Sequence, residues 1–428
     1  MMKIIDVRTA VVEANFDWTY VRVYTDKGTF GTGECFFAPG LTNIIEDLKQ
    51  VIIGKDPRNI ERLFVELQHA TSGAGSIAGF AINAITGIES ALWDLKGKEL
   101  GVPIYQLLGG KYRDKIRIYC DAHGGDDLES LNNVLRPRQT KWMTELGVRM
   151  EHENPDNAIR FFGSDNLDNY TPEAYAKQAR ETVAKGFNVM KFDVDVPSKF
   201  TMDDYNRALH NMEIKQMVGF VEAIRKEVGW DIDIAIDCHW RYNPNDALRL
   251  AWELEPYGLL WLEDPTPPEN LKALCQVTKN TKTPIASGEN LYLRHAFREV
   301  LESGAMNIIA PDFQKVGGIW EAKRISDMAE NYFVGVVPHN IASPIGTLAS
   351  VHVAAASLGF IALEYHADSV PFWNDLLMHE GEPLIQNGYI KVPEGPGLGY
   401  ELNEIAAKKY AKEGELFFGE VLEKVKNK

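Results

Sequence analysis

Three acidic residues end successive apolar stretches of this chain at equal intervals. Asp237 lies in IAIDCHW, Glu263 in LLWLEDP and Glu289 in PIASGEN, so that each acid is 26 residues from the next. Each apolar run is typical of a buried parallel strand, and the stretches between the runs have helical spacing. Parallel strands of one sheet end at the same edge, so we expect the three carboxylates to meet there.

Three carboxylates at one edge need a positive charge to stay ionised together, because burial and mutual repulsion both favour the protonated form. Oxygen ligands without a thiolate favour a hard divalent cation. We therefore predict a Mg²⁺ site, with Mn²⁺ as the alternative. The alternative is that the three acids are unrelated, because single acids at strand ends are common in α/β proteins. Three acids in register make this alternative a poor explanation.

Two histidines have neighbours that suit proton transfer. Asp312 and His339 are 27 residues apart, about one strand and one helix, which predicts adjacent strand ends. An aspartate that accepts from one imidazole nitrogen raises the basicity of the other, so we predict that His339 is a general base. His239 follows Asp237 by two positions and should share its side of a strand. We predict that His239 is either a metal ligand or a general acid.

Further charged residues end two other apolar runs. Lys191 is predicted to neutralise a substrate carboxylate or a developing enolate oxygen. Asp193 lies two positions further on the same face, as a substrate contact or as the partner of Lys191 in a salt bridge. Glu364 is predicted to contact the substrate or to orient another side chain.

The elements that must position these residues follow a strand and helix rhythm. Eight apolar runs begin at residue 115: IRIYCDA, NVMKFDVD, IDIAIDCH, LLWLED, PIASGE, NIIAPD, VGVVPH and FIALEY. Helical stretches separate most of them, which favours a closed α/β barrel over an open sheet. Barrel enzymes carry their active sites at the carboxyl ends of the strands, where all the residues above are found. We predict that the barrel spans residues 113–385.

The rest of the chain differs from this pattern. Residues 1–112 predict antiparallel strands followed by helices, and so a separate α+β domain, to which residues 386–428 are predicted to return. A polar insertion at about 123–170 follows the first barrel strand and is too long for an ordinary loop. A lid, an oligomer contact and partial disorder are all open interpretations of the insertion.

Composition narrows the class of protein. The 428 residues carry a net charge of −16, which argues against nucleic acid or an anionic membrane as a partner. The four cysteines are scattered without a CxxC pair, so neither a disulfide framework nor a zinc ribbon is expected. No apolar run approaches the roughly 18 residues of a membrane span, and the first residues lack signal-peptide features. We expect a cytoplasmic enzyme with a small-molecule substrate.

These motifs resemble the mandelate racemase branch of the enolase superfamily. The stretch ALWDLKGKELGVPIYQLLGG, residues 91–110, looks like the helix motif of that branch's capping domain, and the acids and histidines named above follow its pattern. The resemblance implies a modified TIM barrel, (β/α)₇β, with an α+β capping domain formed from both termini. It further implies Mg²⁺, removal of the proton α to a carboxylate, and an even-numbered homo-oligomer.

Two departures from the racemase pattern narrow the implied reaction. Racemases of this branch carry Lys-x-Lys on the second barrel strand, whereas this chain has Lys191, Phe192 and Asp193 and so lacks the second base. Asp237-x-His239 resembles the galactonate and gluconate dehydratases of the branch, in which that histidine is the acid. The resemblance implies a hydro-lyase that converts an aldonic acid of the D-galactonate or D-gluconate type to a 2-keto-3-deoxy acid. A pentonate (arabinonate or xylonate) dehydratase, an epimerase or racemase, and a non-catalytic scaffold are the alternatives.

Substrate selectivity is predicted to reside in the capping-domain loops at 34–41 and 71–79, with the insertion as a further candidate. Trp18 and Phe37 are the predicted substrate contacts in this domain, with Phe36 and Ser72 as further candidates. Packing within the capping domain is an equally good explanation for each of the four.

Overall fold

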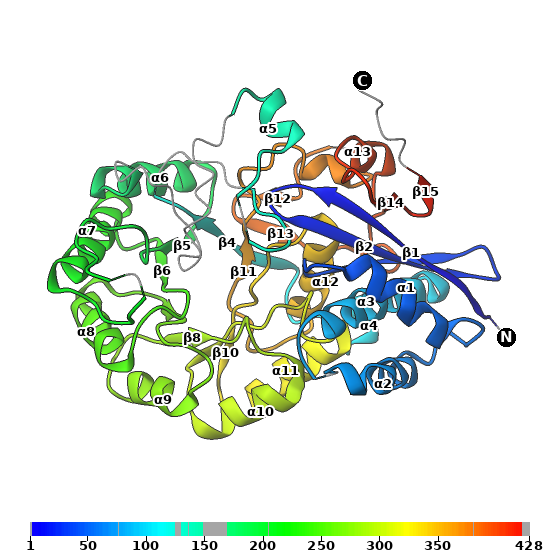
Figure 1. The fold of residues 1–428 in the computed structure, drawn as a ribbon, viewed down its shortest axis with the longest axis horizontal. Coiled ribbons are helices and arrows are strands. Elements are labelled where there is room, and N and C mark those ends of the chain that lie inside the picture. Colours follow the sequence, from blue (N-terminus) through cyan, green and yellow to red (C-terminus); the bar gives the residue numbers. More distant parts are fainter. Residues whose placement is uncertain are drawn as a thin grey trace.

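The computed structural model describes residues 2–75, 77–124, 130–135, 137–148, 169–203, 205–379 and 381–421. A ring of helices surrounds a set of short strands, and a smaller part built from the first residues lies beside that ring (Figure 1). Within the described residues, no helix combines the length and the apolar character that crossing a bilayer requires.

The first part begins with an antiparallel sheet in the order β1-β2-β3, formed by β1 (Ile4–Glu13), β2 (Asp17–Thr25) and β3 (Phe30–Cys35). Four helices follow it: α1 (Leu41–Ile52), α2 (Ile60–Ala70), α3 (Phe80–Leu100) and α4 (Ile104–Leu107). Helix α3 packs directly on β3 because Gly31 and Gly33 have no side chain. A Cβ atom on Gly31 would lie 2.0 Å from the carbonyl oxygen of Ala91 in that helix.

The second part contains the eight predicted parallel strands: β4 (Lys115–Ala122), β5 (Val189–Asp193), β6 (Asp233–Asp237), β7 (Trp261–Glu263), β8 (Ile285–Ser287), β9 (Ile308–Ile309), β10 (Gly335–Val336) and β11 (Leu363–Tyr365). Strands β4 to β10 pair in chain order, and β11 pairs with β4. Backbone hydrogen bonds from Val336 N to Gly359 O and from Ile361 N to Val336 O join β10 to the segment that leads into β11. These bonds close the ring and agree with the predicted barrel.

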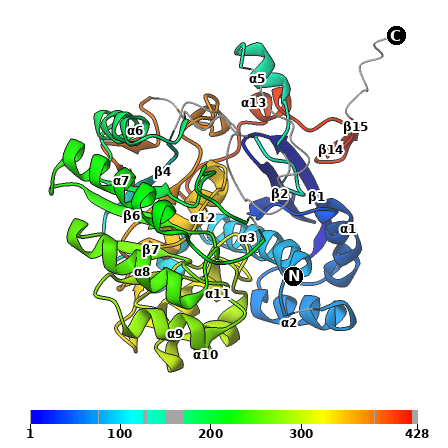
Figure 2. The ribbon, with the colours of Figure 1, turned by 60° about the vertical axis from the view of Figure 1, so that its left-hand side comes forward.

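Apart from the short helix in the insertion, seven helices of the described chain alternate with the eight strands, as the (β/α)₇β pattern requires: α6 (Pro172–Ala184), α7 (Asn211–Val228), α8 (Pro244–Leu254), α9 (Leu271–Lys279), α10 (Leu293–Ser303), α11 (Ile319–Glu330) and α12 (Pro344–Ala355). They cover the outside of the strands, as Figure 2 shows for α6 to α11. Short 3-10 turns occupy Ser72–Ala74, Glu255–Tyr257 and Asn374–Leu376. The predicted α/β fold with an α+β capping domain is confirmed.

A buried cluster with members on or beside all eight barrel strands fills the interior: Tyr119, Val189, Ala235, Trp261, Ala286, Ile308, Ala310, Val337 and Ala362. Large rings at Tyr119 and Trp261 alternate with small side chains, and the two rings meet edge to face at 5.2 Å. The barrel is therefore packed solid in its middle. Polar side chains such as Lys191, two residues beyond Val189, lie above this layer at the carboxyl ends of the strands.

Two carboxylates of the capping domain bind the amino termini of barrel helices. Glu34 accepts hydrogen bonds from the backbone N–H groups of Ser343 and Gly346 at the start of α12. Glu89 accepts from Ile319 N, at 2.7 Å, and from Trp320 N at the start of α11. Helix amino termini carry unpaired N–H groups and a partial positive charge, so these contacts join the two parts electrostatically.

The C-terminal segment contacts both parts. Its elements are β12 (Ile385–Gln386), β13 (Tyr389–Lys391), α13 (Glu404–Lys409), β14 (Leu416–Phe417) and β15 (Glu420–Val421). Strand β13 pairs antiparallel with the beginning of β4, whereas Tyr410 O accepts a hydrogen bond from the N–H group of Glu13, the last residue of β1. The domain boundaries near residues 112 and 385 stay predictions.

Part of the predicted insertion at 123–170 is described, and it includes the short helix α5 (Lys141–Glu145). Leu131 N donates to Asn15 O, and Arg138 Nη1 lies 2.5 Å from Asp17 Oδ1. These residues therefore hold the turn between β1 and β2. Residues 125–129, 136 and 149–168 of the insertion lie outside the described residues.

Candidate active site

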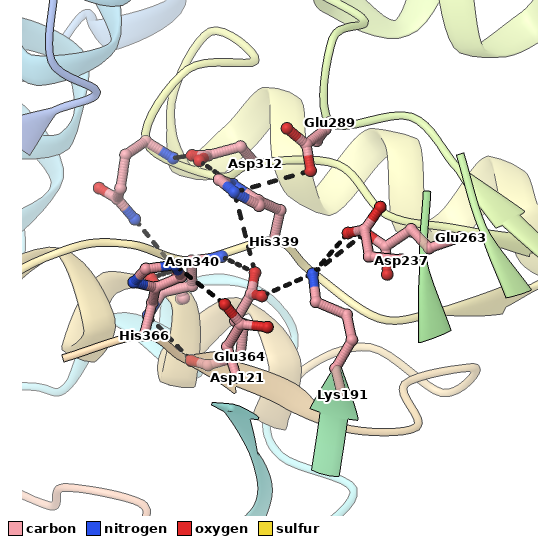
Figure 3. A network of polar contacts seen from close by, with 12 residues as sticks. Asp121, Lys191, Asp237, Glu263, Glu289, Asp312, His339, Asn340, Glu364 and His366 are labelled. Carbon is pink, nitrogen blue, oxygen red and sulfur yellow. Dashed lines mark hydrogen bonds and ion pairs between the residues drawn. The ribbon is translucent and has the colours of Figure 1, made fainter. Parts of the chain in front are cut away.

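The three equally spaced acids meet at the carboxyl ends of neighbouring barrel strands. Asp237 ends β6, Glu263 ends β7, and Glu289 follows β8 by two residues. One carboxylate oxygen from each lies within 4.8 Å of the others, and all three side chains are buried (Figure 3). Burial raises the pKa of Glu263 well above its ordinary value; Lys191 opposes that rise, and the charge of Asp237 adds to it.

This donor set fits a hard divalent cation. It offers only carboxylate oxygens, and Oε1 of Glu263 accepts no hydrogen bond within the described part of the chain. A cation at this position would offset the burial and the repulsion from Asp237 that raise the pKa of Glu263. Asp237, Glu263 and Glu289 are the residues that would hold Mg²⁺.

Lys191 lies between these acids and the last barrel strand. Its Nζ atom is 3.0 Å from Asp237 Oδ2, 3.5 Å from Glu263 Oε1 and 2.8 Å from Glu364 Oε1 (Figure 3). Within the described residues, the ion pairs of Lys191 therefore join it to these three acids and not to Asp193, the partner considered in the salt-bridge interpretation. Lys191 is 3% exposed, so its ammonium group places a buried positive charge among these carboxylates.

Asp312 and His339 form the predicted dyad. Their Oδ2 and Nδ1 atoms are 2.6 Å apart, and Gln314 N donates to the other oxygen of Asp312. Because the aspartate occupies Nδ1, the Nε2 atom of His339 is the nitrogen that faces the cavity. Nε2 lies 3.7 Å from Glu289 Oε2 and 3.9 Å from Glu364 Oε2.

The surroundings of His339 act on its pKa in opposite directions. Burial lowers the pKa, but the charges of Glu289 and Glu364 and the contact with Asp312 outweigh burial and raise it to about 10. A base for neutral pH needs a lower value. A divalent cation bound by Glu289 would offset part of this negative field and lower the pKa of His339.

His239 is the second imidazole of the cavity, and an aspartate also contacts its Nδ1 atom. Asp195 Oδ1 lies 3.1 Å from Nδ1, while Nε2 faces Asp237 Oδ2 at 4.0 Å. Burial lowers the pKa of His239, but Asp237, Asp195 and Asp193 raise it well above its ordinary value. A raised pKa keeps the ring protonated, which suits a proton donor.

The reason for the position of His239 differs from the expected one. Strand alternation was expected to place His239 beside Asp237, but β6 ends at Asp237 itself. His239 and the following Trp240 have φ values of 41° and 59°, in the left-handed region that non-glycine residues rarely adopt. A strained turn therefore brings the imidazole into the cavity, as happens at many functional sites.

Glu364 lies on β11 and is almost fully buried. Its Oε2 atom accepts a hydrogen bond from Asn340 N at 2.9 Å, and Oε1 faces Lys191. Asn340 directly follows His339, so Glu364 both holds the loop that carries the dyad and lies beside the ammonium group. Together, Lys191, Asp237, Glu289, His339 and Glu364 form one continuous polar network (Figure 3).

The capping domain supplies apolar side chains to this region. The ring of Phe36 lies 6.0 Å from the ring of His339 and stacks on Phe37. A cavity lined by Phe36, Phe37 and Trp18 also reaches Asp312. Trp18 is 2% exposed and donates to Ile341 O, so it contributes to the packing between the two parts of the chain. Substrate contacts by Trp18 and Phe37 stay predictions.

Ser72 lies in an exposed 3-10 turn, and its place in a substrate site also stays a prediction.

Sequence reasoning missed four polar residues beside the cavity: Asp121, His123, Asp195 and His366. His366 Nε2 lies 2.9 Å from Asp121 Oδ2, and His123 Nδ1 lies 3.2 Å from Asp193 Oδ2. The rule that located the other acids could have found them, because IYCDAH, KFDVD and ALEYH also stand at the ends of barrel strands.

Comparisons with known proteins agree with this architecture. Residues 7–109 match the N-terminal domain family of mandelate racemase and muconate lactonizing enzyme, and residues 174–406 match the family described as enolase C-terminal domain-like. A crystal structure of a mandelate racemase/muconate lactonizing enzyme-like protein from Rubrobacter xylanophilus superimposes with a TM-score of 0.85. It is 39% identical and covers 97% of this chain and 99% of its own.

Two curated relatives have named activities. The chain is 43% identical over 419 residues to the D-xylonate dehydratase of Haloferax volcanii, covering 98% of this chain and 91% of that protein. It is 30% identical over 403 residues to the D-galactonate dehydratase of Ralstonia pickettii, covering 92% of this chain and 91% of that protein.

Proposed function

The chain belongs to the mandelate racemase and muconate lactonizing enzyme family of the enolase superfamily, and from that premise we propose that it is a sugar-acid dehydratase. The observation that carries the proposal is the pair of histidine–aspartate dyads on either side of the three acids. His339 with Asp312 lies next to Glu289, and His239 with Asp195 lies next to Asp237.

Mg²⁺ held by Asp237, Glu263 and Glu289 would stabilise the negative charge that develops on the substrate carboxylate as its C2 proton leaves. The remaining chemistry belongs to the chain's own side chains. Lys191 supplies a second positive charge to the developing enolate, and Glu364 fixes the ammonium group at 2.8 Å.

His339 removes the C2 proton. Its Nδ1–H group donates to Asp312, so the lone pair of Nε2 faces the cavity and forms the new N–H bond. The electron pair of the broken C2–H bond becomes the carbon–carbon double bond of an enol. His339 ends this step as an imidazolium that Asp312 stabilises.

His239 supplies the proton for the leaving group. Its Nε2–H bond breaks as the C3–O bond breaks, and the C3 hydroxyl departs as water. The enol that remains loses its hydroxyl proton and gains a proton at C3, which gives the 2-keto-3-deoxy acid. The sum is loss of one water from the sugar acid, with the enzyme regenerated after His339 releases its proton and His239 regains one.

We propose a pentonate of the D-xylonate type as the substrate. The support is the 43% identity to a D-xylonate dehydratase over almost the whole of both chains. Hexonates of the D-galactonate or D-gluconate type are the second candidate, because the 30% identity to a D-galactonate dehydratase also spans most of both chains. Assembly as an even-numbered homo-oligomer stays a prediction.

A panel of sugar acids tests the proposal. The purified protein with Mg²⁺ is incubated with D-xylonate, L-arabinonate, D-galactonate and D-gluconate, and 2-keto acid is measured as its semicarbazone. We expect the highest kcat/KM with a pentonate. Keto acid from a hexonate alone would overturn the pentonate assignment and retain the dehydratase.

The same incubations in D₂O distinguish an epimerase. Stereoinverted substrate that carries deuterium at C2, without any keto acid, would replace the dehydratase by an epimerase. If no acid in the panel gave either result, the proposed function would be wrong.

A further inference from the structure

One of the three acids that would hold Mg²⁺ is bound from beneath by the packed interior of the barrel. Trp261 Nε1 donates a hydrogen bond to Glu263 Oε2 at 2.7 Å, and both residues are 0% exposed. They are two positions apart on β7, so their side chains point to the same side of the strand. The mechanism above uses Glu263 as a metal ligand and gives Trp261 no role.

The indole of Trp261 is held in place by its neighbours in the barrel layer. Its ring meets the ring of Tyr119 edge to face, at a centroid distance of 5.2 Å and an angle of 75°. Ala235 pairs with Trp261 on one side of β7, and Ala286 pairs with Glu263 on the other side. Both alanines belong to the same buried cluster as the indole, and their small side chains leave room for the large ring. The indole N–H group therefore has a fixed position.

The two carboxylate oxygens of Glu263 consequently have different surroundings. Oε2 is bonded to the indole of the layer below. Oε1 lies 3.5 Å from Lys191 Nζ, the ammonium group that also contacts Asp237 (Figure 3). Oε1 is therefore the oxygen on the side of the other acids, and Oε2 is directed into the barrel interior.

This arrangement affects divalent cations of different size unequally. Mg²⁺ requires a nearly ideal octahedron of six ligands, whereas the larger Ca²⁺ takes six to eight oxygens and often both oxygens of one carboxylate. Glu263 can offer its second oxygen only if the carboxylate turns away from the indole. That rotation would leave a buried N–H group without its acceptor, which is unfavourable.

We propose that Trp261 is a positioning residue for the metal site, and that it makes the site favour Mg²⁺ over Ca²⁺. It holds Glu263 so that Oε1 alone faces the cation. The inference depends on the metal site of the proposed function and not on the reaction assigned to that site. An indole that only filled the barrel would contribute to stability without affecting the choice between the two ions.

The affinities of the two ions test the proposal without any substrate. Kd values for Mg²⁺ and for Ca²⁺ are measured by titration calorimetry on the full chain, freed of metal by a chelator, for the wild type and Trp261→Phe. Loss of a contact that orients a metal ligand weakens binding by about 10- to 100-fold, and we expect the Kd for Mg²⁺ to rise by that factor. The Kd for Ca²⁺ should change by less than about threefold, because the released carboxylate can give Ca²⁺ both oxygens.

Trp93 provides a matched control. Its Nε1 atom also donates to a buried glutamate, Glu89 Oε1, at the same distance of 2.7 Å, but that glutamate lies in the capping domain and binds the start of α11. Trp93→Phe therefore removes the same kind of hydrogen bond away from the three acids. It should lower the Tm and leave both Kd values unchanged.

Crystal structures of the wild-type protein with Mg²⁺ and with Ca²⁺ test the same proposal without a substitution. We expect Oε1 of Glu263 on the cation in both structures, with Oε2 still bonded to the indole. This measurement decides the proposal even if Trp261→Phe does not fold.

Three results would overturn the inference. Equal changes of both Kd values in Trp261→Phe, or no change in either, would show that the indole does not select between the ions. An altered Kd ratio in Trp93→Phe would show that the ratio responds to any lost tryptophan hydrogen bond. Both oxygens of Glu263 on Mg²⁺ in the wild-type crystal would contradict the proposed orientation.

The proposed function can fail separately. A wild-type protein that bound neither ion would overturn the predicted metal site and this inference together. A protein that bound Mg²⁺ with the expected selectivity, and dehydrated no sugar acid, would support the inference and refute only the proposed reaction.

Discussion

The Nε2 atom of His339 lies 3.7 Å from Oε2 of Glu289, so the predicted base and a predicted metal ligand face each other directly. The proton affinity of this histidine is therefore tied to the charge that Glu289 carries. Binding of a divalent cation and preparation of the base would then be one event, because the cation would offset the negative field that raises the pKa of His339.

This relationship predicts the titration of His339. In protein freed of metal by a chelator, the charges of Glu289 and Glu364 should hold its pKa near 10, against the opposing effect of burial. Adding Mg²⁺ should lower that pKa, and NMR titration of the imidazole, assigned with His339→Asn, measures both values. A metal-free pKa below 7 would contradict the account.

The same shift affects stability. Because the pKa of His339 is raised from 6.5 to about 10 in the folded metal-free protein, this residue stabilises the folded state. The stabilisation is fully present below pH 6.5 and is lost as the pH rises toward about 10. His339→Asn should remove this dependence, so the unfolding midpoints of the chelated variant should vary less between pH 7 and 10. Parallel profiles of the two proteins would show that His339 does not contribute.

Metal binding should be visible as stabilisation. Mg²⁺ at about 100 times its Kd stabilises a folded protein by about 2.7 kcal/mol, so the wild-type Tm should rise with added Mg²⁺. Glu263→Gln should lose most of that rise, because it removes a buried ligand charge. Glu213→Gln, a buried glutamate of a helix capping box, is the control and should lower the Tm while keeping the rise.

Substitutions of the two histidines should affect different steps of the reaction. His339→Asn removes the base, so both C2 exchange in D₂O and keto-acid formation should fall by about 10²- to 10⁴-fold. His239→Asn removes the acid, so keto-acid formation should fall by a similar factor while C2 exchange persists. If His239→Asn lost C2 exchange while its Mg²⁺ response stayed normal, the assignment of the base role to His339 alone would be wrong.

We expect the buried His352 to make the stability of the folded protein sensitive to acid. Burial lowers its pKa to about 4, with the hydrogen bond to Leu398 O opposing that shift. The folded protein resists protonation between pH 6.5 and 4 whereas the unfolded chain accepts the proton, so stability present above pH 6.5 is lost as pH falls. The full effect is about 3 kcal/mol. Urea midpoints of His352→Gln should decline less over this range, and equal declines would exclude His352 as the cause.

Much of the barrel could be predicted because its signals are local. Each strand is a short apolar run, each helix has its own spacing, and the polar residue after each run marks the carboxyl end. This rule selected Asp237, Glu263, Glu289 and Lys191 from the sequence, and the structure brings these residues together. Their catalytic and metal-binding roles stay predictions.

The contacts that could not be predicted depend on how the ring closes. Asp121 and His366 are far apart in the chain and meet because β11 pairs with β4, a register that no local pattern specifies. His239 depends on a left-handed turn at a non-glycine residue, which residue preferences disfavour. The position of the insertion could not be predicted either. It binds the turn between β1 and β2 through individual side chains such as Arg138, and no repeating sequence pattern marks such contacts.

Glu34 and Glu89 have a consequence for the independence of the two halves of the molecule. Each carboxylate belongs to the smaller half yet completes a helix of the larger one. In a barrel expressed alone, the backbone N–H groups that Glu89 and Glu34 accept from at the starts of α11 and α12 would lose these partners. The isolated smaller half would keep two glutamates without the helix starts that they bind. The halves are therefore expected to fold as a single cooperative unit, with one unfolding transition.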